Sequence, residues 1–186
     1  MFESLPVTNI AVCQSMSDFE GFGDKRRPLV LSRLEQAMVS QSSVVVRRLG
    51  KDRAGEMSAH RVLSAEDVTA AGIVECLSRR TARASRGHRV VVAQDTTEVN
   101  FPGHSRKRLG AAGRTGKTPG LFIHAAVAIS ADDEMALGLV DAAIWTRDGK
   151  VKTARRKRST QDKESQRWLR AAELTSERLA DRRAHV

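Results

Sequence analysis

The sequence predicts an α+β fold, with helices in the first half, three β-strands in the second half and a long helix after them. Three observations carry this prediction. Apolar residues recur at helical spacing up to about residue 86, β-branched residues then dominate three runs between residues 89 and 145, and helical spacing returns after residue 160. The chain has 186 residues, of which 40% are hydrophobic, so it can bury a core.

The first helical stretch is expected over residues 17–41. Pro28 suits the first turn of a helix, because that position needs no backbone N–H. The apolar residues that follow at helical spacing are Leu31, Leu34 and Met38. The short run 44–46 is compatible with either a strand or a loop.

A second helix is expected to begin at Ser64. The run Ser64-Ala-Glu-Asp67 has the pattern of a capping box, in which a hydroxyl and acids satisfy the free N–H groups of the first turn. Gly87 offers a stop at the other end. The residues expected on its buried face are Val68, Ala71, Val74 and Leu77.

Three strands are predicted over residues 89–101, 121–130 and 136–145. The second and third are separated by only five residues, which implies an antiparallel hairpin. A final helix is expected from about Thr160 to Arg183. Its expected buried stripe consists of Trp168, Ala171, Ala172, Thr175 and Leu179.

Positive charge is concentrated in two segments. The formal net charge is +10, and residues 106–117 and 147–158 account for all of it, since the rest of the chain is close to neutral. Such local excess favours a polyanionic partner, with nucleic acid as the first candidate, over the alternative of two solvated loops. The candidate contacts are Arg106, Lys107, Arg108, Arg114, Lys117, Arg155, Arg156, Lys157 and Arg158, together with Lys25, Arg26 and Arg27.

Several classes of protein are disfavoured. No run of eighteen apolar residues could span a membrane, and the first residues do not form a signal peptide. Cys13 and Cys76 are the only cysteines, so neither a disulfide scaffold nor a structural zinc site is expected, and a reducing cytosol is the default. The run 111–118 matches a relaxed phosphate-loop pattern, but Pro119 follows at once, where the helix of such a loop would have to begin.

Asp95 is the strongest candidate for chemistry. Alternate residues of a strand share a face, which places this carboxylate among Val91, Ala93 and Val99. A carboxylate in an apolar face needs a partner, a hydrogen bond or a metal. The alternative is a structural Asp bound to a loop amide. Three other residues have both a functional and a plain structural interpretation: His124, Asp141 and Glu164.

Together these motifs resemble bacterial DDE-type transposases of insertion sequence family four, the transposon-five-like group. The similarity runs from about residue 17, and its ordered motifs lie between residues 94 and 169. They are Gln94-Asp-Thr-Thr-Glu-Val-Asn-Phe101, Gly120-Leu-Phe-Ile-His-Ala-Ala-Val-Ala-Ile129, Leu137-Gly-Leu-Val-Asp-Ala-Ala-Ile-Trp-Thr-Arg147 and Lys163-Glu-Ser-Gln-Arg-Trp-Leu169. Looser matches upstream lie at Phe19 to Arg27, Leu31 to Leu34, Ala59 to Val62 and Ser64 to Glu66.

This resemblance implies a helical DNA-binding region over residues 1–88 and a ribonuclease-H-like catalytic core over 89–186. In such a core three carboxylates hold two Mg²⁺ or Mn²⁺ ions for attack on a phosphodiester. Asp95 matches the first carboxylate. The second is expected on a strand after the final helix, where this sequence stops, and the third belongs to a Tyr-Arg-Glu-Lys signature in a chain that has no Tyr. We therefore expect a truncated core of three strands and a long helix, with weak metal binding or none.

The sequence thus predicts a truncated transposase that binds double-stranded DNA at insertion-sequence ends without cutting it, in the cytoplasm on the nucleoid. Homodimerisation is left open. One alternative is an intact small binding or interaction module derived from a transposase. The other is an active metal-dependent nuclease that uses Asp95 with Asp141 or Glu164. This interpretation depends on Asp95 being the remnant of a magnesium pocket. An Asp95 carboxylate that points into bulk solvent, or a closed sheet with its own complete acidic cluster, would overturn it.

Overall fold

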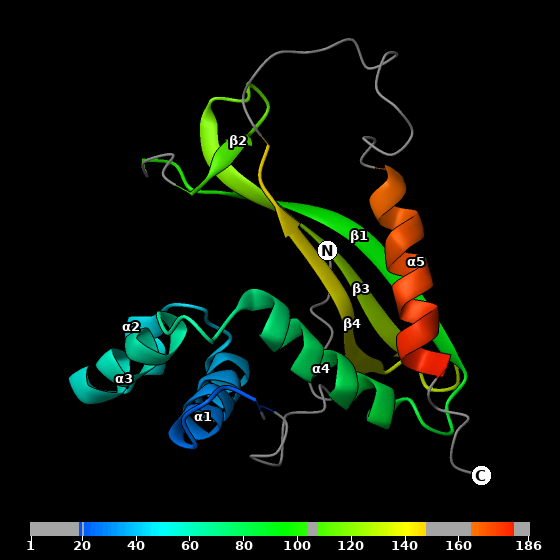
Figure 1. The fold of residues 1–186 in the computed structure, drawn as a ribbon, viewed down its shortest axis with the longest axis horizontal. Helices are drawn as coiled ribbons and strands as arrows, with labels where there is room; N and C mark the ends of the chain where they lie inside the picture. Colours follow the sequence, from blue (N-terminus) through cyan, green and yellow to red (C-terminus); the bar gives the residue numbers. More distant parts are fainter. Residues whose placement is uncertain (1–18, 20, 104–107, 148–164, 181–186) are drawn as a thin grey trace, which may run out of the picture.

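The computed structural model describes residues 19, 21–103, 108–147 and 165–180, in which five helices and a four-stranded antiparallel sheet are formed (Figure 1). The α+β prediction is confirmed at this level. The elements are α1 (Arg26–Gln41), α2 (Val46–Leu49), α3 (Arg53–Leu63), α4 (Ala70–Ala84), β1 (Val90–Asn100), β2 (Gly110–Ala112), β3 (Thr118–Ser130), β4 (Ala136–Trp145) and α5 (Ser165–Ala180).

Strand β3 is the centre of the sheet. It pairs antiparallel with β1 from Val90↔Ser130 to Asn100↔Gly120, and on its other side with β4 and the short β2. The predicted β3–β4 hairpin is therefore confirmed. Strand β2 pairs only with residues 118–120 of β3, so it extends the β1–β3 ribbon at one end of the sheet (Figure 1). We call residues 108–120, which include β2, the arm.

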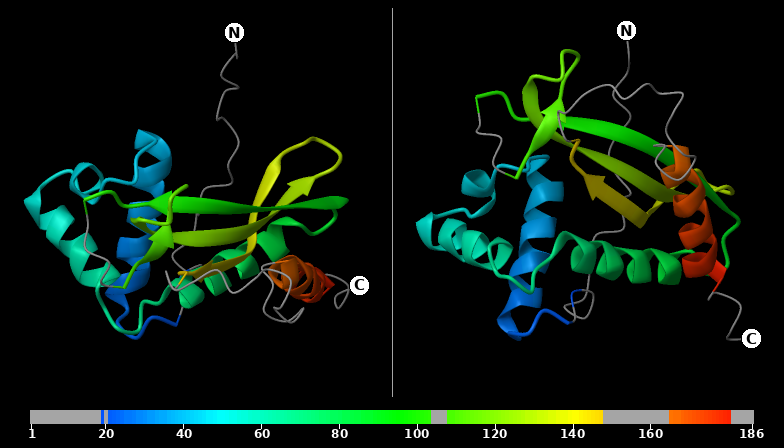
Figure 2. Two further views of the ribbon diagram at one scale, coloured as in Figure 1. Left: turned by 90° about the horizontal axis from the view of Figure 1, so that it is seen from above. Right: turned by 45° about the horizontal axis from the view of Figure 1, so that its top comes forward.

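The two faces of the sheet differ. Helices α4 and α5 both lie on one of them (Figure 2), where Val140 and Leu179 form a buried cluster with Ala128 and Leu137. Along β3 every second residue, from Phe122 to Ser130, is buried on this covered face. The residues between them are half-buried on the face without a helix, which we call the open face.

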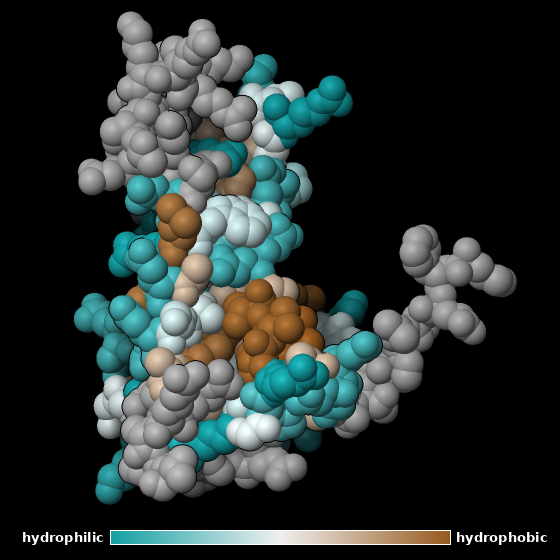
Figure 3. All heavy atoms as spheres, turned by 90° about the vertical axis from the view of Figure 1, so that its right-hand side faces the viewer, coloured by the Kyte–Doolittle hydropathy of each residue, from teal (hydrophilic) through white to brown (hydrophobic). Residues whose placement is uncertain are grey.

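The open face is largely apolar. Leu121, Ile123, Val127 and Ile129 lie along its middle, because they alternate with the buried residues of β3. In the neighbouring strands Val91 and Ile144 are 55% and 47% exposed. Hydrophobic side chains gather at the surface on the side where β1 and α5 lie (Figure 3).

The first three helices form a layer of their own. Its main cluster consists of Phe19, Phe22, Leu31, Val62, Val68 and Cys76, and a second cluster consists of Leu34, Leu49 and Ala59. Of the apolar residues at helical spacing in α1, Leu31 and Leu34 are buried and Met38 is half-buried. Helix α4 connects the two parts, because Cys76 belongs to the helical cluster while Ala82 packs on the sheet cluster. No described helix has the length and apolar character needed to cross a membrane.

The predicted capping box at Ser64 is wrong. Ser64 follows the last residue of α3, a helix that the sequence analysis did not anticipate, and α4 begins only at Ala70. The true cap is Thr69, whose hydroxyl accepts a hydrogen bond from the N–H of Gly72 at 3.0 Å. The turn between the helices buries Val68 in the helical cluster, so a continuous helix from residue 64 would lose this contact.

The boundaries of three other elements also differ from the predictions. Helix α1 begins at Arg26, after Gly21 and Gly23 adopt positive φ angles of 99° and 61°. Residues 110–112, which belong to none of the three predicted strands, form β2. In α5 the residues Ala171, Thr175 and Leu179 are buried as predicted. The prediction is wrong for Trp168, which is 44% exposed, and for Ala172, which is also exposed. The predicted start at Thr160 lies outside the described residues.

Helix α4 approaches β4 closely at Gly138. This glycine has a φ of 139°, and a Cβ built there would lie 2.5 Å from the Oγ1 atom of Thr81. The Thr81 hydroxyl is within hydrogen-bond distance of two carbonyl oxygens, 2.7 Å from that of Leu139 and 2.9 Å from that of Leu77. A side chain at residue 138 would therefore push the helix away from the strand.

We expect Gly138→Ala to lower the free energy of unfolding by about 3 kcal/mol, through overpacking and a backbone angle that suits only glycine. Urea denaturation measures this loss. Gly87→Ala is the matched control, because Gly87 has a φ of 79° with no atom within 4 Å of a built Cβ, and it should cost only about 1 kcal/mol. Equal losses in the two variants would refute the close contact.

Candidate nucleic-acid interface and the Asp95 face

Asp95 lies on the open face of the sheet, in the middle of β1. It pairs across the ladder with Ala125 and is exposed. Its Oδ1 atom accepts a hydrogen bond from the N–H of Thr96 at 2.7 Å. The carboxylate is thus held by its own strand and not by a loop amide, and the exposure of Asp95 counts against the expected metal pocket.

Asp141 lies on the opposite face from Asp95. It is 8% exposed, and its Oδ1 atom accepts a hydrogen bond from Arg178 of α5 at 2.7 Å. The same guanidinium donates to the backbone carbonyl of Val140 at 2.7 Å and to Glu75 of α4 at 3.2 Å. Asp141 is therefore a structural residue that joins β4 to two helices.

The described residues do not supply a second metal ligand to Asp95. Glu98 accepts hydrogen bonds from the N–H of Gly113 at 2.6 Å and from Asn100 at 2.9 Å, so it fastens the arm to β1. Glu164 lies outside the described residues. In the described ranges no group of three or more His, Cys, Asp or Glu residues could hold a metal ion. Asp95 by itself does not fit the two-metal site that the resemblance implies, since such a site needs several carboxylates.

His124 is a hydrogen-bonded core histidine. It is 1% exposed, with Nδ1 at 2.8 Å from the hydroxyl of Thr96 and Nε2 at 3.2 Å from the Oε1 atom of Gln94. Because an amide oxygen can only accept, Nε2 donates and Nδ1 accepts. The ring of Trp168 lies over the imidazole at 4.7 Å. Both nitrogens are occupied, which supports the structural interpretation over a ligand role.

The arm carries part of the expected basic surface. Arg108, Arg114 and Lys117 are exposed there. The chain turns at Gly113 and Gly116, which have φ angles of 74° and 67°, and then enters β3. A strand and not a helix follows the phosphate-loop-like run, as the position of Pro119 led us to expect. Six predicted contacts lie outside the described residues: Arg106, Lys107, Arg155, Arg156, Lys157 and Arg158.

At the start of α1, Lys25 and Arg26 are exposed, whereas Arg27 is engaged within the protein. The guanidinium of Arg27 forms an ion pair with Asp67 and donates to the carbonyl of Phe22 at 3.2 Å. It thereby fastens the start of α1 to the turn before α4. We reassign Arg27 from a DNA contact to a structural residue, because Asp67 already neutralises it.

The structure adds a basic cluster that the sequence analysis missed, formed by Arg47, Arg48, Lys51 and Arg53. Three of these residues, all except Arg48, line a hollow of about 430 Å³ together with Asp52 and Glu56. Arg53 pairs with Glu56 at 3.0 Å, while Arg47, Arg48 and Lys51 are exposed and form no ion pair with the described residues. These four basic residues are close together in the sequence, within residues 46–53. They are fewer than the basic residues of segments 106–117 and 147–158, which therefore drew the prediction.

The arm and the α2–α3 pair project on the same side of the molecule, away from α5 (Figure 1). The exposed cations of both parts could therefore approach one extended polyanion. No protein-family model matches the chain, and no curated protein is similar enough to it to count as a match. The assignment of a function therefore depends on the resemblance of the motifs and on this distribution of charge.

We expect Arg178→Met to lower the free energy of unfolding by about 2 kcal/mol, because it leaves the buried Asp141 carboxylate without its cation; partial exposure of Arg178 reduces the loss below that of a fully buried pair. Asp141→Asn should cost less, since an amide oxygen can still accept from Arg178. Chemical denaturation measures both. Arg170→Gln, on the exposed side of α5, is the control and should stay within about 0.5 kcal/mol.

Proposed function

We propose that this chain is a transposase-related protein that binds double-stranded DNA through phosphate contacts and does not cut it. The observation that carries the proposal is the set of exposed cations on one side of the molecule, in the α2–α3 region and the arm. Exposed cations can neutralise phosphates, and phosphate contacts supply most of sequence-independent DNA affinity.

The resemblance to family-four transposases supports the assignment of the substrate. In this proposal the helical layer and the arm hold the duplex, and the sheet corresponds to the start of a ribonuclease-H-like core. Asp95 occupies the position of the first catalytic carboxylate. We assign it no reaction step, because among the described strands it is the only acid on the open face.

Binding to a 30-base-pair duplex should be strongly salt-dependent. About four phosphate contacts predict a loss of roughly 100-fold in affinity between 50 and 200 mM salt, because counterions are released on binding. Fluorescence anisotropy measures the affinity at each salt concentration. The absence of duplex affinity even at 50 mM salt would defeat the proposal.

Two double variants test which cations bind. Arg47→Gln/Arg48→Gln and Arg108→Gln/Arg114→Gln should each weaken binding several-fold and reduce the slope of log affinity against log salt by one to two. Arg86→Gln/Arg170→Gln removes the same charge from exposed positions elsewhere and is the matched control. If the control weakened binding as much as the other two, only net charge and no specific surface would be involved.

The nuclease alternative has its own test. Supercoiled plasmid incubated with the protein and Mg²⁺ or Mn²⁺ should stay intact, because Asp141 is bound to Arg178 on the other face of the sheet. Nicking that disappears in Asp95→Ala would show that the protein is an active enzyme. Codons downstream of Val186 that encode an Asp-rich strand and a later Tyr/Arg/Glu helix would support descent from a longer transposase.

A further inference from the structure

The arm is a short two-stranded ribbon that ends in a turn. Residues 110–112 of β2 pair antiparallel with residues 118–120 of β3, and residues 113–117 connect them. The arm extends from one end of the sheet (Figure 1). At about 3.3 Å per strand residue, the three paired residues and the turn beyond them give the arm a length of roughly 10 Å or more.

Backbone hydrogen bonds fix the shape of the arm. In the turn, the N–H of Gly116 donates to the carbonyl of Gly113 at 2.9 Å. The N–H of Gly113 donates to the carboxylate of Glu98 in β1 at 2.6 Å. On the other side, the N–H of Ala111 donates to the carbonyl of Arg147 at 2.8 Å. An arm anchored on both sides loses little conformational entropy when it binds, which favours a binding role over a solvated loop.

The turn presents one arginine without a partner. Arg114 is exposed and forms no hydrogen bond or ion pair with the described residues. Its neighbours Gly113, Thr115 and Gly116 are small, so its long side chain can reach beyond the backbone of the turn. The sequence has no acid between Glu98 and Asp132, so the arm itself contains no carboxylate that could neutralise this guanidinium.

The dimensions of the arm select one groove of the duplex. The major groove of B-form DNA is about 12 Å wide and about 8.5 Å deep, and it admits a two-stranded ribbon. The minor groove is only about 6 Å wide, whereas the two backbones of a ribbon already lie about 4.8 Å apart before side chains are added. The major groove of A-form RNA is too narrow and deep for such an arm. The arm is long enough to bring Arg114 to the bases of a B-form major groove.

The chemistry of arginine selects one base in that groove. Guanine presents two acceptors there, O6 and N7, and a guanidinium can donate to both at once. Adenine presents one acceptor and one donor. Because arginine can only donate, it matches guanine better than adenine.

We propose that the arm enters the major groove of double-stranded DNA and that Arg114 donates hydrogen bonds to the O6 and N7 atoms of a guanine. Arg108, at the base of the arm, contacts phosphate only. This inference rests on the proposed function, because the arm meets a groove only if the protein binds a duplex. It adds selectivity for a base, which phosphate contacts do not supply.

Duplexes in which 7-deazaguanine replaces every guanine test the contact, because this analogue lacks the N7 acceptor but still pairs with cytosine. In fluorescence anisotropy, the full-length protein should bind a duplex rich in G·C pairs about 5-fold or more tightly than its 7-deazaguanine counterpart. Hypoxanthine in place of guanine removes only an amino group in the minor groove, so it should change the affinity by less than about 2-fold.

Two variants of the arm separate the base contact from a phosphate contact. Arg114→Gln and Arg108→Gln remove the same charge from exposed positions, so both should weaken binding to the unmodified duplex and leave thermal unfolding unchanged. Arg114→Gln should reduce the ratio of the two affinities, guanine over 7-deazaguanine, to about 1, since its contact with N7 is lost. Arg108→Gln should keep the wild-type ratio.

The outcomes distinguish this inference from the proposed function. Equal affinity of the wild-type protein for the guanine and 7-deazaguanine duplexes would overturn the inference and leave phosphate-based DNA binding intact. A larger effect of hypoxanthine than of 7-deazaguanine would also overturn it, because the contact would then lie in the minor groove. Loss of the ratio in both variants would refute the assignment to Arg114. No affinity for any duplex would defeat the proposed function itself.

Discussion

The guanidinium of Arg178 is the contact on which the arrangement of the second half of the molecule depends. It binds Asp141 and the Val140 carbonyl of β4 and also Glu75 of α4, so a strand and two helices are joined at one point. Because the carboxylate of Asp141 is buried, the pair can exist only with α5 lying across the sheet. Together with the apolar cluster of Ala128, Leu137, Val140 and Leu179, this contact holds α5 on the covered face.

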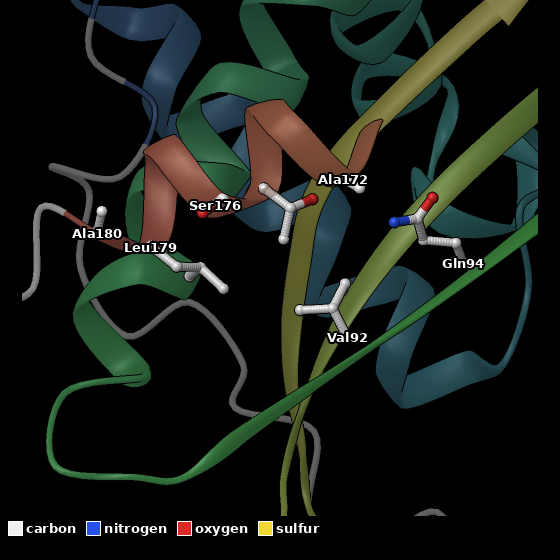
Figure 4. A pocket seen from close by; sticks show the side chains of 7 residues that line it. Val92, Gln94, Ala172, Ser176, Leu179 and Ala180 are labelled. Carbon is white, nitrogen blue, oxygen red and sulfur yellow. The ribbon is translucent and has the colours of Figure 1, made fainter. Parts of the chain in front are cut away.

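The functional features follow from that choice of face. Residues that alternate toward the helices form the apolar cluster and the hydrogen-bonded group around His124. Residues that alternate the other way, Asp95 among them, remain accessible. Helix α5 lies beside β1 and leaves a slot between them (Figure 4). The exposed cations of the arm and of the α2–α3 region lie at the other end of the molecule (Figure 1).

The candidate site was only partly accessible from the sequence. Alternation in β1 placed Asp95 on the side of Val91 and Ala93, and the structure agrees. Charge counting found the arm, because its cations are close together in the chain. It could not distinguish Arg27 from the neighbouring cations Lys25 and Arg26. Arg27 is neutralised by Asp67, which lies forty residues away in the chain. Charge counting also overlooked Arg47 and Arg48, whose importance comes from their position beside the turn into α3.

The sequence by itself determined the order of the longer helices and strands, apart from α2, α3 and β2. It also determined the β3–β4 hairpin and the burial of Ala171, Thr175 and Leu179, because these depend on periodicity and on short connections. Tertiary contacts decided the rest. The start of α4 depends on the burial of Val68, which overrides the capping pattern at Ser64. The separation of Asp95 from Asp141 depends on the sheet that lies between them: residues on opposite faces cannot act together, whatever their chemistry.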